Sequence, residues 1–362
     1  MLYSCSPRSG QPTVVAGRPE RGAGSKRRFA VDLHCHVFVP EAADLVGERF
    51  DLEMDDLFKF ANQATRDVNA RQAGTIHEQL TSVQRRLADM DAMGVDVQAI
   101  SPAPLQYYYG LDAELGRAAA QMINDKIATI AEQNSDRIVG LANVPMQSPE
   151  FAVAELERAV NELGLRGVEI STNVAGAELS EARFRQFFAK AEELDVVVFL
   201  HPSGFSDGRR LTDHYFTNVI GNPLDSTIAV SHLIFGGVLD AYPKLKVCVA
   251  HGGGYLAAYS GRIDHAHGAR EDCRRCIKEP PTSYLKRLYF DTVVFTEHQL
   301  EYLVRLYGSD HIVLGTDYPY DMGMYDPVGF VEGAAELTDA DKAAIVGGNA
   351  ARLLGFKVQE SA

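Results

Sequence analysis

Several things are scarce in this sequence, and each absence narrows the function. Tryptophan is missing, and no apolar run approaches the ~20 residues that a membrane-spanning helix needs. Positive charge is outweighed, with 35 Lys and Arg against 49 Asp and Glu, which disfavours a nucleic-acid partner. No G-x-G-x-x-G motif follows the first strand-like run, so a dinucleotide-binding fold loses support. These features favour a globular protein that acts on a small molecule, without a membrane or nucleic-acid role.

Cysteine is also sparse, and the five cysteines are an odd number. Cys35 and Cys248 lie inside apolar, strand-like runs, which fits a reducing compartment better than a disulfide framework. Cys273 and Cys276 form a lone C-x-x-C, whereas a structural zinc site needs two such pairs or nearby histidines. We therefore expect a cytoplasmic protein without disulfides.

The first 28 residues differ in composition from the rest. They are basic and rich in Gly, Ser and Pro, with no apolar signal-peptide core. We expect residues 1–28 to be a disordered basic extension, with a transit peptide or an early start codon as alternatives. Residues 29–362 are expected to form one metal-dependent catalytic domain.

From residue 29 onward, β-rich runs alternate with helical patterns. Runs of Val, Ile, Leu and Ala are typical of parallel strands buried on both faces. Eight such runs predict an α/β fold of the (β/α)8 TIM-barrel class, with an open doubly wound sheet as the alternative. The expected strands are 29–34, 95–101, 138–144, 167–170, 196–201, 247–251, 288–293 and 312–317, and the clearest helices are 84–94, 115–134, 149–164 and 180–194.

Two longer segments follow strand ends: an inserted loop region after the first strand, from residue 40 to about 82, and a second segment at 204–223. Barrel enzymes build their substrate pockets from loops at this position. A serine at position 148 precedes the third helix and could cap it.

Histidines and one aspartate mark the ends of several predicted strands. His34 and His36 are two residues apart on the first strand, so both side chains point to the same face. His201, His251 and Asp317 each end a further strand. Because strand ends of a barrel meet at one mouth, these dispersed residues are expected to form one cluster.

This cluster predicts a single divalent metal ion held by His34, His36, His201 and Asp317. Imidazole and carboxylate donors suit Zn²⁺ best, and Mn²⁺, Fe²⁺ or Co²⁺ are alternatives. A catalytic ion keeps one position open, so we assign His251 as the base that deprotonates water on the ion. Asp317 either serves as a ligand alone or also relays a proton.

The motifs VDLHCH, FLHP, AHGGGYLAAYSGRIDHA and VLGTDYPYDMG resemble the amidohydrolase superfamily. The resemblance runs from residue 29 to 356 and is strongest to its nonhydrolytic decarboxylases, the α-amino-β-carboxymuconate-ε-semialdehyde decarboxylase-like family. Many hydrolytic members carry a lysine on strand four that bridges two metals. Here GVEIS has Glu169 and no lysine, which favours one metal.

The resemblance implies four substrate-binding residues and a homodimer. Arg262 matches an arginine that binds the substrate carboxylate, in some members across the dimer interface, and a helix-surface ion pair is the alternative. Arg71 is a possible second carboxylate-binding arginine. Tyr215 or Phe216 is expected to stand where relatives have a tryptophan beside the substrate.

The function predicted from these features is metal-dependent decarboxylation of an aromatic or unsaturated carboxylic acid. The alternative is a hydrolase or hydratase of a ring-cleavage product, lactone or amide, which would use the same ligands. A non-catalytic metal-binding scaffold is a third class, and an acid/base histidine beside an open metal position argues against it.

Overall fold

The computed structural model describes residues 28–356, so the predicted extension lies outside the described residues up to position 27. Arg28 belongs to the folded chain, because its guanidinium pairs with Glu332 at 2.6 Å and Asp339 at 3.1 Å.

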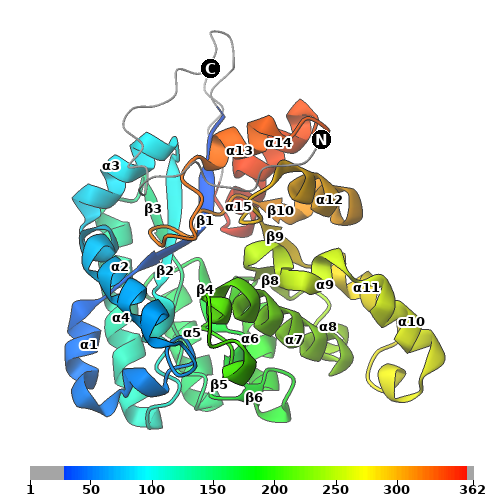
Figure 1. Cartoon of the computed structure of the whole chain (residues 1–362), viewed down its shortest axis with the longest axis horizontal. Helices are drawn as coiled ribbons and strands as arrows, with labels where there is room; N and C mark the ends of the chain where they lie inside the picture. Colours follow the sequence, from blue (N-terminus) through cyan, green and yellow to red (C-terminus); the bar gives the residue numbers. More distant parts are fainter. Residues whose placement is uncertain (1–27, 357–362) are drawn as a thin grey trace.

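Eight parallel strands form the centre of the molecule (Figure 1). They are β1 (Val31–Val37), β2 (Val97–Pro102), β3 (Ile138–Gly140), β4 (Gly167–Ser171), β7 (Val197–His201), β8 (Lys246–Val249), β9 (Tyr289–Asp291) and β10 (Ile312–Val313). Every strand predicted from the sequence is present, with ends shifted by a few residues.

The strands pair in the order β1-β2-β3 and β4-β7-β8-β9-β10, and backbone contacts join these two sheets at both edges. At one seam Ala142 pairs with Val168, and at the other Cys35 pairs with Tyr318. Backbone hydrogen bonds reinforce the second seam, as the Leu33 amide donates to the Leu314 carbonyl at 2.9 Å. The eight strands therefore form a closed ring, and the predicted barrel is confirmed.

Helices surround the ring and bury its outer face. They are α1 (Pro40–Val46), α2 (Gln63–Thr81), α3 (Val83–Met93), α4 (Ala113–Gln133), α5 (Pro149–Asn161), α6 (Arg185–Glu193), α7 (Asn222–Phe235), α8 (Val238–Ala241), α9 (Gly254–Ala258), α10 (Gly261–Ala269), α11 (Pro281–Leu285), α12 (Glu297–Tyr307), α13 (Pro327–Gly333), α14 (Asp339–Ala343) and α15 (Asn349–Leu353). Helix α10 lies at the periphery, away from the strands (Figure 1).

Local sequence explains where the predicted helices begin and end. The Ser82 side chain accepts a hydrogen bond from the Arg85 amide at the start of α3, and Gly94 ends the helix in a left-handed conformation. Ser148 precedes α5 as expected, but its side chain makes no capping hydrogen bond. The expected serine cap is wrong, and Pro149 at the first helical position supplies the start signal instead.

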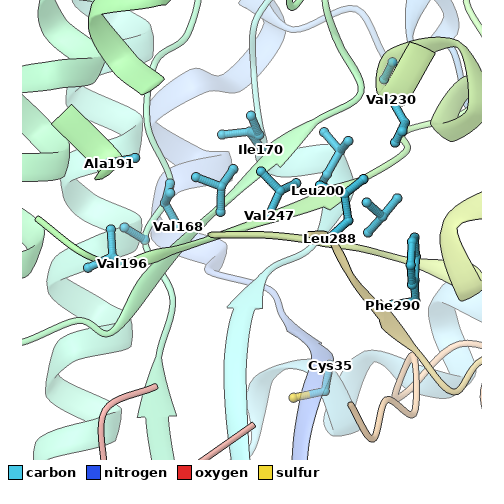
Figure 2. Packing of buried hydrophobic residues seen from close by; sticks show 14 of the residues in the cluster. Cys35, Val168, Ile170, Ala191, Val196, Leu200, Val230, Val247, Leu288 and Phe290 are labelled. Atoms are coloured by element: carbon cyan, nitrogen blue, oxygen red, sulfur yellow. The ribbon is translucent and has the colours of Figure 1, made fainter. Parts of the chain in front are cut away.

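Figure 2 shows how the strands pack against the helices. Val168 on β4 lies beside Ala191 of α6, whereas Leu200 on β7 lies on the side of Val230 of α7, and all four are buried. Apolar burial of this kind contributes about 25 cal/mol per Å², so the shell of helices holds the ring closed. A second, smaller buried cluster includes Leu33 and Phe199.

The two long segments predicted after strand ends lie against each other. The first holds η2 (Leu52–Met54) and α2, and the second ends in η6 (Thr217–Gly221). The Asn62 amide donates to the Thr212 carbonyl at 3.1 Å, which ties the segments together. A short antiparallel hairpin, β5 (Asn173–Val174) with β6 (Ala177–Glu178), was not predicted. Across residues 28–356, no helix is both long and apolar enough to span a membrane.

Candidate metal centre

The predicted metal residues come from four strands that end on the same side of the barrel. His34 and His36 lie on β1, and His201 is the last residue of β7. His251 follows β8, and Asp317 follows β10. Parallel strands place all these ends at one mouth, as the sequence pattern predicts.

The side chains gather tightly around the Asp317 carboxylate. One donor atom from each of His34, His201, His251 and Asp317 lies within 4.8 Å of the others. The Nε2 atoms of His34 and His36 are each 3.3 Å from Asp317 Oδ1. The chain thus brings together all five residues singled out from the sequence.

Many donor atoms of this cluster are buried and lack a hydrogen-bond partner. They are His34 Nε2, His36 Nε2, both ring nitrogens of His201, and Asp317 Oδ1. A buried polar atom without a partner costs about 1–3 kcal/mol, so such a group of atoms demands a ligand. Nitrogen and oxygen donors that converge in this way fit one divalent cation.

The electrostatics of the cluster also suit a cation. Burial alone would raise the pKa of Asp317, but the neighbouring imidazoles, first His34, hold it well below its usual range. Burial, reinforced by His36, lowers the pKa of His201 well below its usual range. For His34, Asp317 and Asp291 overcome burial and raise the pKa to about 10, so a metal at its Nε2 would displace a proton.

Asp291, at the end of β9, contacts His34 and the backbone of His251, and the sequence analysis did not identify it. Its Oδ2 is 2.6 Å from His34 Nδ1 and accepts the His251 amide at 3.0 Å. Its Oδ1 accepts the Gly252 amide at 2.8 Å. A carboxylate on Nδ1 leaves Nε2 of His34 available and fixes the ring orientation.

His251 lies at a strained turn directly after β8. Its φ is +56° and the next residue, Gly252, has φ +60°. A Cβ on Gly252 would come within 2.3 Å of Val294 Cγ1, so only glycine fits there. His251 Nε2 is 3.4 Å from Asp317 Oδ2, and its side chain is 16% exposed while His34 and His36 are fully buried. The His251 ring therefore lies beside the Asp317 carboxylate and is partly accessible.

Glu169 occupies the strand-four position where a lysine is missing. It is fully buried, accepts a hydrogen bond from the Tyr107 hydroxyl, and its Oε2 is 3.8 Å from His36 Nδ1. Burial raises its pKa above the usual range. The His36 Nδ1 atom is 3.1 Å from the Pro102 carbonyl, which orients this ring.

A cavity of about 290 Å³ opens beside the metal residues. His201 and Asp317 line it, as does Tyr215, one of the predicted substrate residues. Phe216 is not among the lining residues. The structure places its ring against His214, with centroids 5.3 Å apart. The cavity is close to the lower end of the ~300–1,000 Å³ range of ligand pockets.

The two predicted substrate arginines do not reach the cavity within one chain. Arg71 lies on α2 and is exposed, while its neighbour Gln72 lines the cavity. Arg262 lies on α10 and is also exposed. Their roles in carboxylate binding stay predictions.

Comparison with known proteins agrees with this geometry. The family description "Amidohydrolase" matches residues 31–356, which is nearly the whole described chain. The chain belongs to the amidohydrolase family. This amidohydrolase is 35% identical over 272 residues to the 2-amino-3-carboxymuconate-6-semialdehyde decarboxylase of Dictyostelium discoideum, covering 75% of this chain and 76% of that protein.

Solved structures share the fold of this amidohydrolase. The 5-carboxyvanillate decarboxylase from Sphingomonas paucimobilis matches with a TM-score of 0.82 and 27% identity, covering 91% of this chain and 99% of that chain. The dihydroxybenzoic acid decarboxylase from Polaromonas sp. JS666, with bound manganese and 2-nitroresorcinol, matches with a TM-score of 0.78, 24% identity, and coverage of 91% and 97%. The predicted family and fold are confirmed.

Proposed function

We propose that this amidohydrolase is a metal-dependent, nonhydrolytic decarboxylase of an aromatic or unsaturated carboxylic acid in aromatic-compound catabolism. The observation that carries the proposal is the set of unpaired, buried metal-donor atoms that opens on a cavity of ligand size. The decarboxylase names of the Dictyostelium and Sphingomonas relatives support it.

The residues that would hold one divalent ion are His34, His36, His201 and Asp317. His251 also lies within reach, and its exposure and strained backbone favour a proton-transfer role instead. When bound, the ion supplies positive charge that stabilises the substrate carboxylate and the charge that develops on the ring. Zn²⁺ suits these donors, and Mn²⁺ is the alternative that the Polaromonas structure contains.

The protein's own chemistry is the delivery of one proton. Decarboxylation breaks the bond between the carboxylate and the ring carbon, and the electron pair stays on that carbon until it takes up a proton. The His251–Asp317 pair, whose Nε2 and Oδ2 atoms are 3.4 Å apart and of which Asp317 lines the cavity, would hold that proton and deliver it. The bond cleavage itself releases carbon dioxide, the proton carrier regains its proton from solvent, and no water is consumed overall.

A homodimer would complete the substrate site. Arg262 is exposed on the peripheral helix α10, where it could reach the mouth of a partner subunit. An Arg side chain binds a carboxylate through two parallel hydrogen bonds. Arg71 and Phe216 would contribute only after the inserted segments shift around a substrate, whereas Tyr215 already lines the cavity.

The cysteines support a cytoplasmic location. Cys35 and Cys248 are buried free thiols, and Cys273 and Cys276 are also unpaired although three residues apart. Free thiols of this kind are typical of a reducing compartment.

The test is a balance of carbon dioxide and water with metal-loaded protein. Purified protein loaded with Zn²⁺ or Mn²⁺ is incubated with 5-carboxyvanillate, 2,6-dihydroxybenzoate and 2-amino-3-carboxymuconate-6-semialdehyde. A decarboxylase releases one carbon dioxide per product without incorporating ¹⁸O from water. Products that gain water without losing carbon dioxide would instead support a hydratase or hydrolase.

The role of His251 is tested by His251→Asn. We expect the metal content to remain and kcat to fall by about 10²–10⁴, the usual contribution of a general acid or base. His311→Asn is the matched control, because His311 lies at the opposite end of β10. Full activity of His251→Asn would remove the proposed proton carrier.

A further inference from the structure

Strand β1 contains an irregularity at the point where the metal residues begin. Asp32 pairs with Gln98 of β2, and Cys35 pairs with Ile100, so β1 has one residue more than β2 over this stretch. Such a β-bulge bends a strand and re-aims the side chains beside it. The bulge includes His34, so it affects how the first metal residues are presented.

The bulge determines which way the two histidines of β1 point. Leu33 shares a buried cluster with Phe199 of β7, which lies across the ring from β1, so Leu33 faces the interior. The His34 ring also faces the interior, because its centroid is 5.0 Å from that of Phe199. Consecutive residues of a regular strand face opposite sides. In a β1 without the bulge, His34 and His36 would therefore point outward, toward the helices.

The carboxylate of Asp32 is hydrogen-bonded both to the bulge and to the chain after β10. Asp32 is fully buried, and its Oδ1 accepts the amides of His34 and Thr316, each at 3.1 Å. Its Oδ2 accepts the Thr316 hydroxyl at 2.6 Å and the Gln98 side-chain amide at 2.9 Å. Thr316 directly precedes Asp317. One carboxylate thus fixes the backbone of His34 and the backbone next to Asp317.

Arg86, on α3, extends this network to the end of β1. The residue is only 2% exposed. Its Nη1 donates to Gln98 Oε1 at 2.9 Å, and its Nη2 donates to the His36 carbonyl. The guanidinium also lies 4.9 Å from the ring centroid of Tyr318, the residue after Asp317. Arg86 therefore contacts the backbone of one metal residue and the side chain next to another.

We infer that Asp32 and Arg86 are positioning residues, which hold the β1 bulge and the chain after β10 so that the metal residues of the two strands converge. Neither side chain belongs to the metal cluster, and each acts through backbone that carries a ligand. The inference rests on the proposed function, because it takes His34, His36 and Asp317 as metal ligands. Changing either residue should leave every ligand present and alter how the ligands are arranged.

The experiment measures metal binding by Asp32→Asn and Arg86→Lys, independently of turnover. Asparagine replaces one acceptor oxygen by a donor, so hydrogen bonds are lost in either orientation of its amide. Lysine keeps the charge but cannot bond Gln98 and His36 through a planar fork. A chelator competition should show the Kd for Zn²⁺ rising about 10–100-fold in each variant. The visible absorption spectrum of protein saturated with Co²⁺ should change as well, because it reports the arrangement of the ligands.

Two matched controls make the same chemical changes away from the metal centre. Asp264, on the peripheral helix α10, also accepts an amide and a hydroxyl from one threonine, Thr282, at 2.9 Å and 2.5 Å (Figure 1). Arg137 also donates to backbone carbonyls, those of Val95 and Asp96, at the end of the barrel where β2 and β3 begin. Asp264→Asn and Arg137→Lys should leave the metal Kd and the Co²⁺ spectrum as in the wild-type protein, even where they lower the free energy of unfolding.

The inference is overturned if Asp32→Asn and Arg86→Lys both bind Co²⁺ with the wild-type spectrum, because lower affinity with an unchanged spectrum reflects stability alone. If Asp32→Asn does not fold, the spectrum of Arg86→Lys decides, since lysine preserves the buried charge. A wild-type protein that binds no metal would overturn the proposed function and this inference with it. Changed spectra in the variants, without carbon dioxide release by the wild-type protein, would support the positioning role and contradict only the proposed function.

Discussion

At the scale of single residues, the buried carboxylates fall into two groups that differ in their surroundings. Asp291 and Asp317 are buried among imidazoles, which outweigh the effect of burial and lower both pKa values. Asp225 is buried beside neutral groups, and burial raises its pKa from 3.8 to about 6. Neighbouring imidazoles stabilise the negative charge of Asp291 and Asp317. Asp225 would instead be more stable in its neutral, protonated form.

Asp291→Asn tests whether this carboxylate supports the metal centre through His34. The amide oxygen of the variant can still accept the backbone hydrogen bonds. It carries no negative charge, however, and so cannot hold the proton on His34 Nδ1 as the carboxylate does. We expect metal affinity to fall by about 10–100-fold with little change in fold. The measurement is a competition titration with a metal chelator, with Asp44→Asn on the exposed surface of α1 as the control. An unchanged metal affinity would contradict the supporting role.

Asp225→Asn should change how stability depends on pH. The folded pKa of about 6 lies above the unfolded value of 3.8, so the charged native carboxylate lowers stability as the pH rises through this window. Well below pH 3.8 both states are protonated and the variant should match the wild-type protein. Above pH 7 it should be more stable, by about 3 kcal/mol at most.

Urea unfolding at pH 4.5 and at pH 8 measures this difference. The Thr172 hydroxyl and Asn173 amide, which donate to Asp225, can bond the amide oxygen of the variant instead. The exposed Asp44→Asn variant, measured in parallel, is the control for the loss of one carboxylate. A constant difference for Asp225→Asn would show that its carboxyl is not neutral at low pH in the fold.

Sequence reasoning found the residues that end strands and missed the one that supports them. His34, His201 and Asp317 follow long apolar runs, so their position at the barrel mouth can be inferred. Asp291 also ends a strand, but that strand has only three residues and its role depends on backbone amides about forty positions earlier. Such partners are visible only once the ring of strands is closed.

At the scale of elements, long apolar runs were predictable and short or irregular ones were not. The eight barrel strands carry a strong burial signal in the sequence. The hairpin β5–β6 has two residues in each strand, too few for any periodicity. The π-helical turn at Thr217–Gly221 has no sequence signal that distinguishes it from an ordinary helical turn. The turn lies in the second inserted segment, which packs against the first.

Gly204→Ala tests that packing at the second inserted segment. Gly204 has φ +78°, and a Cβ there would come within 2.4 Å of the Asp56 backbone in the first inserted segment. Gly164 has a similar φ of +71° with nothing within 4 Å of such a Cβ. We expect Gly164→Ala to lower the free energy of unfolding by about 1 kcal/mol. Gly204→Ala should lower it clearly more, on the order of 2–4 kcal/mol.

Thermal unfolding and hydrogen exchange of α2 measure this effect. Gly204→Ala should also increase exchange in α2, because the two inserted segments would separate. Equal losses of stability in Gly164→Ala and Gly204→Ala would show that the close approach of Gly204 to Asp56 does not hold the two inserted segments together.

At the level of the whole molecule, the barrel determines where the metal residues meet, and the inserted segments line the cavity beside them. The alternation of strands and helices predicts the ring, and the ring brings dispersed ligands together. It does not predict which face of α2 points inward. Arg71 and Gln72 are neighbours about 100° apart around the helix, and it is Gln72 that lines the cavity.

One exposed surface bears on how the protein assembles in solution. We call this surface the aromatic face, and its residues lie on or next to α9 and α12, which contact each other. They are Tyr255, Tyr259, Phe295 and Tyr302, with Tyr259 72% exposed. Exposed aromatic residues that gather on one face are typical of an interface. Arg262 follows three residues after Tyr259, so the same contact would bring it to a partner.

We therefore expect the protein to sediment at about twice the 39.6 kDa of one chain. Tyr259→Asp places a charge in the aromatic face and should shift the protein toward monomers. The KM for the substrate acid should rise as the dimer dissociates, because Arg262 of the second copy then leaves the site. Met54→Asp, at another exposed apolar position, should do neither. Analytical ultracentrifugation with parallel assays measures both effects. A wild-type monomer with full activity would show that one chain completes the site alone, with no need for Arg262 of a second copy.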